Sequence, residues 1–144
     1  MEFVFDDGGR ASAGYKGGTG DCAVRAIAIA LNCPYQDAYD LVNAYGAVEY
    51  KTKRRKTQSS ARTGVYKATF KRIMKDLEWI WTPTMFVGQG CKVHMKKDEL
   101  PSGRIILNVS KHYCAVVDGV VHDTFLDDRN GTRCVYGYWS KPAQ

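Results

Sequence analysis

The apolar positions of the chain follow helical spacing in its first half and strand spacing in its second half. A first helix is expected over 22–31, CAVRAIAIAL, where only Cys22 and Arg25 interrupt the apolar residues. Such a composition is typical of a buried helix. Further helices are expected over about 34–45 and about 65–77, because apolar residues recur there at intervals of three and four.

From residue 79 onward, short runs of β-branched and aromatic residues alternate with Gly, Pro, Asp and Asn. Helices followed by strands predict an α+β fold, with three helices packed on a C-terminal antiparallel β-sheet. The length of 144 residues fits one domain over 1–144. Alternating aromatic residues at 79, 81, 136 and 138 are expected to pack the sheet onto the helices. The candidate strands are 79–87, 91–95, 104–109, 112–117, 120–125 and 133–139.

One β-hairpin can be assigned residue by residue, because the dipeptide Asp118-Gly119 separates CAVV from VVHD and favours a two-residue turn. Residues directly opposite each other in a hairpin share a face, so His112, Cys114 and Asp123 are expected on one face. His112 is then a diagonal neighbour of Asp123, within reach of a polar contact. The expected pairs are Val117 with Val120, Ala115 with His122, Cys114 with Asp123, and His112 with Phe125.

Cys22 stands where a Gly-, Ser- and Thr-rich loop over 7–21 runs into the first helix. Unpaired N–H groups and the helix dipole lower the pKa of a thiol at this position, and the same N–H groups can hold an oxyanion. Asp21 is the expected N-cap, and the glycines of the loop allow a substrate to approach closely. A nucleophilic thiol needs a base and a group that orients the base. His112 and Asp123 are the candidates.

These motifs resemble those of the papain-like cysteine peptidases, with a Cys opening a buried helix, a His on a distant strand and an Asp on the next strand. GDCAVRAIAIAL and SKHYCAVVDGVVHD are most similar to the compact bacterial branch that cleaves bacteriocin leader peptides. The stretch from GCKVHMKKDELPSGR to RNGTRCVYGYW is similar to uncharacterised small bacteriophage proteins. The resemblance does not cover 47–104 in detail. It implies a papain-like fold with Cys22 as nucleophile, His112 as base and Asp123 as orienting residue.

The chain departs from the papain-like pattern at the oxyanion hole. Papain-like enzymes usually carry a Gln several residues before the Cys, and residues 10–21 contain none. Lys16, Thr19 or, from elsewhere in the chain, Gln89 is the candidate replacement. The charge of Asp21 beside the thiol opposes thiolate formation, an effect that Arg25 can offset.

Basic residues are concentrated in one segment of a chain whose net charge is +6. Residues 51–75 hold ten of the 21 Lys and Arg residues and no acid, and 51–64 is expected to be a basic flexible loop. Such a segment either meets nucleic acid or an acidic protein, or is a solvated loop and helix face. The candidate partner-binding residues are Lys53, Arg54, Arg55, Lys56, Lys67 and Lys71.

Several classes of protein are not expected. No apolar run approaches the roughly 20 residues of a membrane span. The N-terminus also lacks the basic segment followed by an apolar segment that is typical of a signal peptide. A cytoplasmic protein is therefore expected, in the host cell if a phage encodes it. Five cysteines form an odd set without a CxxC pair, so neither a disulfide framework nor a zinc ribbon is expected. No cofactor and no metal site is predicted.

The sequence thus predicts a cysteine-nucleophile enzyme that cleaves a peptide, isopeptide or amide bond, or transfers an acyl group. A flexible peptide tail is the expected substrate. The alternative is a catalytically weak binding protein on a peptidase-like fold, which engages nucleic acid or an acidic host protein through 51–75. A structural, virion-associated protein is a third hypothesis.

Overall fold

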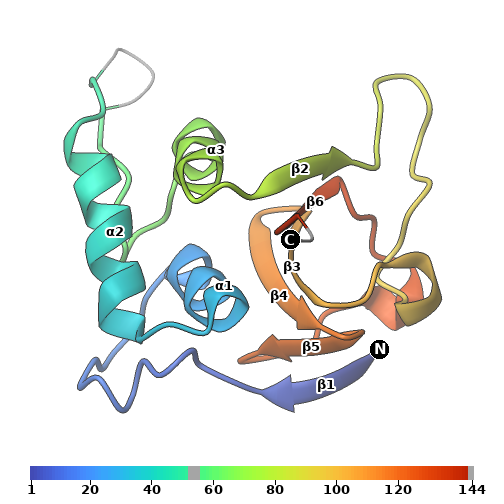
Figure 1. The fold of residues 1–144 in the computed structure, drawn as a ribbon, viewed down its shortest axis with the longest axis horizontal. Helices are drawn as coiled ribbons and strands as arrows, with labels where there is room; N and C mark the ends of the chain where they lie inside the picture. The colour runs from blue at the N-terminus through green and yellow to red at the C-terminus, as the bar shows by residue number, and fades with distance from the viewer. Residues whose placement is uncertain (52–55, 143–144) are drawn as a thin grey trace.

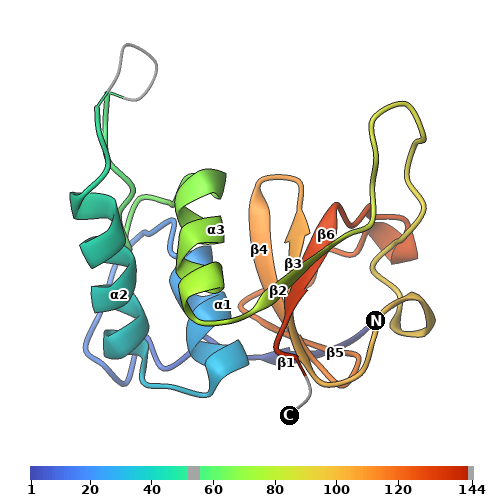
Figure 2. The same cartoon turned by 45° about the horizontal axis from the view of Figure 1, so that its top comes forward.

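The computed structural model describes residues 1–51 and 56–142. Three helices lie together at one side of a six-stranded sheet in both views of the molecule (Figures 1 and 2). None of the described helices is long and apolar enough to cross a membrane. The helices are α1 (Cys22–Leu31), α2 (Tyr35–Ala47) and α3 (Lys67–Asp76), with 3-10 turns at Lys97–Glu99 and Arg129–Gly131. The strands are β1 (Glu2–Phe5), β2 (Ile80–Pro83), β3 (Arg104–Val109), β4 (His112–Val117), β5 (Val120–Asp123) and β6 (Gly137–Ser140).

The prediction of an α+β fold is confirmed, but the sheet is mixed rather than antiparallel. Its strand order is β1-β5-β4-β3-β6-β2, and β1 lies parallel to β5 at one edge. The sequence analysis missed β1 because all four of its side chains are exposed, so the strand carries no alternation of buried and exposed positions. A parallel partner must also come from a distant part of the chain, which local patterns do not reveal.

The hairpin between β4 and β5 has the predicted register, with Val117 opposite Val120 and Ala115 opposite His122. Asp118 and Gly119 both have positive φ, as the expected tight turn requires. The bounds of α1, β3 and β4 also match the prediction. The predicted strand 91–95 is wrong, because this segment contributes only single bridges, from Cys91 to Met85 and from His94 to Cys134.

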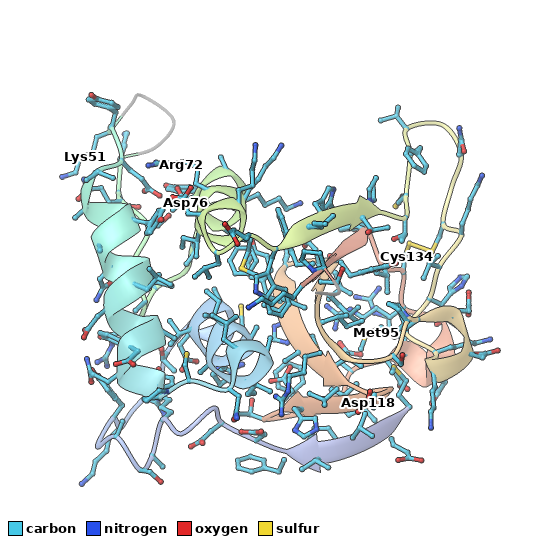
Figure 3. The ribbon with its side chains drawn as sticks, in the orientation of Figure 1. Lys51, Arg72, Asp76, Met95, Asp118 and Cys134 are labelled. Atoms are coloured by element: carbon cyan, nitrogen blue, oxygen red, sulfur yellow. A yellow bond between two sulfur atoms is a disulfide. The ribbon has the colours of Figure 1, made fainter. Side chains whose placement is uncertain are left out.

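Apolar side chains pack on both faces of the sheet. On one face, Ile106, Ala115 and Trp139 join the core of α1, which is buried along nearly its whole length between α2 and the sheet. On the other face, Leu107 and Val116 pack with residues of the long connection before β3, among them Met95 (Figure 3). Trp79 is buried in the core that contains the helices and Trp81 packs against it, which confirms their predicted packing role, whereas Tyr138 packs against the core on the other face.

The sequence analysis expected no disulfide framework, but the structure contains one disulfide, between Cys91 and Cys134 (Figure 3). The two residues are 43 positions apart. They meet because the segment around 85–94 folds back beside residue 134, a tertiary proximity that cysteine spacing does not encode. Cys22, Cys33 and Cys114 remain free thiols.

Residues 57–64 form an irregular segment that is held against α2. The backbone N–H of Ala61 donates to the side chain of Asn43, and that of Ser59 donates to Glu49. Gly46 makes the close approach possible, since a Cβ there would lie 2.0 Å from the carbonyl oxygen of Ser59. Gly46 therefore lies inside α2, at the point where the helix contacts this segment.

Substitution Gly46→Ala is expected to lower the free energy of unfolding by about 2 kcal/mol, because the added methyl group collides with backbone atoms that cannot rotate away. Urea unfolding measures the loss. The control is Gly18→Ala, where a Cβ would meet nothing within 4 Å and the expected change is within about 0.5 kcal/mol. Equal stabilities for the two variants would contradict the packing role of Gly46.

Candidate active site

The structure brings Cys22, His112 and Asp123 together from three elements. Cys22 is the first residue of α1, His112 the first of β4 and Asp123 the last of β5. His112 Nε2 lies 2.6 Å from Asp123 Oδ2, and the imidazole lies close enough to the Cys22 thiol to lower the pKa of that thiol. The diagonal contact predicted from the hairpin register is thus present. Because Nε2 is engaged by Asp123, Nδ1 is the ring nitrogen left for the thiol.

The local environment favours a charged thiolate and imidazolium pair. Burial alone would raise the pKa of the Cys22 thiol, but the hydrogen bonds with His112 and with the backbone of Tyr113 outweigh it. The charges of His112 and Arg25 act in the same direction, so the pKa of Cys22 lies below its ordinary value. Burial likewise opposes the charge on His112, yet its bonds with Asp123 and Cys22 raise its pKa to about 9.

Asp123 is held as a carboxylate. Burial would raise its pKa, but the bond with His112, a 2.7 Å hydrogen bond from the Thr124 backbone and the charge of Arg25 lower the pKa below its usual range. The ring of Phe125 lies against the imidazole at 5.3 Å between centroids, so it limits the positions open to His112. The imidazole is therefore fixed in place by a carboxylate and an aromatic ring.

Behind these three residues, Arg25 joins two buried carboxylates. Its guanidinium forms an ion pair with Asp21 and another, at 3.3 Å, with Asp123. Asp21 is 1% exposed and also accepts a 2.6 Å hydrogen bond from the Tyr35 hydroxyl. Arg10 Nε approaches Asp21 at 3.6 Å. Arg25 thus offsets the charge of Asp21, as the sequence analysis expected.

Asp21 does not act as the predicted side-chain cap, because its carboxylate accepts no hydrogen bond from the backbone of α1. The carboxylate turns instead to Arg25 and Tyr35. The first N–H groups of a helix have no partner within the helix. In α1 they remain without a side-chain acceptor beside Cys22, and can serve an oxyanion.

The thiol opens into a cleft of about 310 Å³. One wall comes from Gly20 and from Thr63, Gly64 and Val65, and a hydrogen bond of 2.6 Å from the Gly20 backbone to Arg62 joins its two parts. The opposite wall comes from the ends of β3 and β4, including Asn108 and Tyr113. A peptide backbone can therefore reach the sulfur from solvent.

The predicted replacements for the oxyanion Gln do not line this cleft. Thr19 donates its hydroxyl to the carbonyl of Arg62, Lys16 is an exposed loop residue, and Gln89 accepts a hydrogen bond from Lys92 in another exposed loop. Asn108 does line the cleft and was missed. A single Asn within the apolar strand RIILNV, at a helix-facing position two residues after Ile106, was the available signal.

Of the predicted partner-binding residues, the structure places Lys67 and Lys71 one turn apart on α3, and Lys67 lines the cleft itself. Lys56, directly before the irregular segment, is exposed. Lys53, Arg54 and Arg55 lie outside the described residues.

Among the described residues, one group has the geometry to meet a metal ion. The ligand atoms of His112, Cys114 and Asp123 lie within 4.8 Å of one another. Burial and the neighbouring Asp123 raise the pKa of the Cys114 thiol well above its ordinary value, which disfavours the thiolate that a metal needs. Arg25 also places a positive charge 3.3 Å from Asp123. Both features disfavour a metal ion at this group.

No protein-family model, curated protein or solved structure matches the chain. The case for a function therefore rests on the geometry and chemistry of the cleft.

Iodoacetamide is expected to alkylate Cys22 faster at neutral pH than an ordinary thiol, because its lowered pKa raises the thiolate fraction beside His112, whose pKa is raised to about 9. His112→Ala should slow the reaction at pH 7 by about tenfold or more, since each unit of pKa changes the thiolate fraction about tenfold. Peptide mass mapping assigns the sites. Cys33 is the internal control, because burial and Asp37 raise its pKa. Equal rates at Cys22 in the two proteins would exclude an activated pair.

Arg25→Met is expected to lower the free energy of unfolding by about 3 kcal/mol, because it leaves buried Asp21 and Asp123 without their shared counter-charge. Urea unfolding at neutral pH provides the measurement. Arg62→Met, at an exposed position, serves as the control, with an expected change within about 0.5 kcal/mol. A loss at Arg25 no larger than at Arg62 would show that the two ion pairs contribute nothing net.

Proposed function

We propose that the chain is a cysteine hydrolase that cleaves a peptide or isopeptide bond, with Cys22 as nucleophile, His112 as acid and base, and Asp123 as the group that orients His112. The observation that carries the proposal is the 2.6 Å contact from His112 Nε2 to Asp123, made by an imidazole that lines the same open cleft as Cys22 and lowers the pKa of its thiol. This arrangement supplies a nucleophile, a base beside it and a group that orients the base, as an activated nucleophile requires.

In the proposed reaction, the Cys22 thiolate attacks the carbonyl carbon of the scissile bond, and its electron pair moves to the carbonyl oxygen. Backbone N–H groups at the start of α1 and the side-chain amide of Asn108 are the donors available to that oxyanion. Collapse of the intermediate breaks the C–N bond, and the leaving amine takes the proton of His112. The products of this half-reaction are a thioester on Cys22 and a free amine.

The second half-reaction returns the enzyme to its starting state. Water attacks the thioester carbonyl while His112 takes its proton, and the Cys22 thiolate leaves with the electron pair of the C–S bond. An amine in place of water would give acyl transfer through the same steps. The arrangement also agrees with the papain-like resemblance of the two sequence motifs, and we propose a distant relationship to that superfamily and to its small phage-encoded members.

A second candidate function is binding without turnover, on the same fold. The observation in its favour is that Lys56, Lys67 and Lys71 are all exposed on the segment that leads into and forms α3. Such a surface fits nucleic acid or an acidic protein. Phosphate binding weakens steeply with salt and is indifferent to alkylation of Cys22, which separates it from catalysis.

Incubation with a synthetic octapeptide library, with mass spectrometry of the products, is expected to show cleavage that Cys22→Ala abolishes. His112→Ala should reduce the rate by about a hundredfold or more, the contribution of a positioned acid and base. Added hydroxylamine should divert the thioester to a peptide hydroxamate. Cys33→Ala, a thiol outside the cleft, is the matched control and should keep the activity. Cleavage that persists in Cys22→Ala would exclude this mechanism.

A further inference from the structure

Beside the catalytic cleft lies a second hollow of about 210 Å³, between α3 and the strands that follow it in the sheet. Lys67, Asn108 and Tyr113 line both hollows, so the two adjoin across these three side chains. Tyr113 directly follows His112 in β4. A substrate whose scissile bond lies at Cys22 therefore passes next to the second hollow, and one of its side chains can enter there.

The floor of this hollow is aromatic and tightly packed. Phe70 stacks on Tyr113 with 4.1 Å between ring centroids, and Trp81 lies 5.1 Å from Trp139. A Cβ on Gly137 would come within 2.3 Å of the Trp81 ring, so this indole already rests on the backbone of β6. Phe70, Tyr113 and Trp139 are buried, so the half-buried ring of Trp81 supplies most of the apolar wall that stays open to a ligand.

The rim of the hollow is positively charged. Lys67 and Lys71 are exposed and project from the same face of α3, and no acidic residue lines either hollow. Within the described part of the chain, neither ammonium group forms an ion pair, although that of Lys67 also lies 5.5 Å from the ring of Tyr136. Both charges are available to a ligand.

We propose that this hollow is a substrate subsite for a glutamate side chain close to the scissile bond, with its methylene stem against the aromatic wall and its carboxylate between Lys67 and Lys71. The inference rests on the proposed function, because the glutamate belongs to the peptide that Cys22 cleaves. The ligand is inferred from the complementary surfaces. An apolar wall can pack against a methylene stem, and two unpaired ammonium groups attract a negatively charged end.

A nucleic acid strand fits this surface less well. Base recognition without sequence preference depends on exposed ring faces on which successive bases stack. Here Phe70, Tyr113 and Trp139 are buried, and Trp81 is packed against Gly137. The lysines alone would attract phosphate, but the floor does not offer a stacking platform.

The experiment uses the octapeptide library with equal contents of Glu and Gln, and compares cleavage rates of sequences that differ only in this residue. At one position near the scissile bond, Glu is expected to be preferred over Gln by about fivefold, the size expected of two partly exposed charge pairs. The preference should fall as the NaCl concentration rises. Lys71→Gln should bring the ratio towards one, and Lys71→Glu should reverse it.

Lys75→Gln is the matched control, since Lys75 is one turn further along α3, exposed, and lines neither hollow. It should keep the wild-type ratio. Cleavage with a Glu-to-Gln ratio near one at every position, or a ratio that Lys71→Gln leaves unchanged, would overturn the subsite while leaving the hydrolase proposal intact.

A binding measurement separates failure of the subsite from failure of the enzyme. Cys22→Ala protein is titrated with a Glu-containing octapeptide and its Gln counterpart, using the fluorescence of Trp81 and Trp139 in the hollow. Tighter binding of the Glu peptide that Lys71→Gln removes would support the subsite even if no peptide is cleaved. Equal binding of both peptides, or Lys71-dependent binding of oligothymidylate in place of the peptide, would overturn it.

Discussion

The buried guanidinium of Arg25 is the interaction on which the arrangement of the site depends. It projects from an otherwise apolar helix and joins Asp21, at the start of that helix, to Asp123, at the end of β5. A lone buried charge is costly, so each of these groups is tolerable only because the others are present. Loss of any one of these groups is therefore expected to destabilise the fold, and the ion pairs connect the N-terminus of α1 to the hairpin that carries His112.

The charges of the site alternate in space. Arg25 lies between Asp21 and Asp123, and Asp123 lies between Arg25 and His112. His112 in turn interacts with Cys22, and each favours the charged form of the other. Removing negative charge at Asp123 would weaken the support for the imidazolium, and removing Arg25 would leave two carboxylates near the thiol. In the proposed mechanism, the nucleophile is thus coupled through contacts of buried polar groups to residues that do not line the cleft.

The sequence predicted the parts of this arrangement that depend on local periodicity. The bounds of α1, β3 and β4 and the β4–β5 register follow from apolar spacing and from Asp118-Gly119, and the register alone brings His112 to Asp123. The strand β1 and the Cys91–Cys134 disulfide were missed because each joins segments that are distant in the chain. Asn108 was missed for the same reason, since the cleft forms only when β3, β4 and α3 meet.

The proposed catalytic residues and the proposed subsite residues come from different elements of the fold. Cys22, His112 and Asp123 come from α1, β4 and β5, whereas the aromatic floor and the two lysines of the second hollow come mostly from α3, β2 and β6. Only the residues that line both hollows connect the two sets. Substitutions on the exposed face of α3 can therefore change which side chain is accepted without touching the buried charges behind Cys22. Under the proposed function, reactivity is tied to stability through Arg25, while selectivity is carried by surface residues that contribute little to the core.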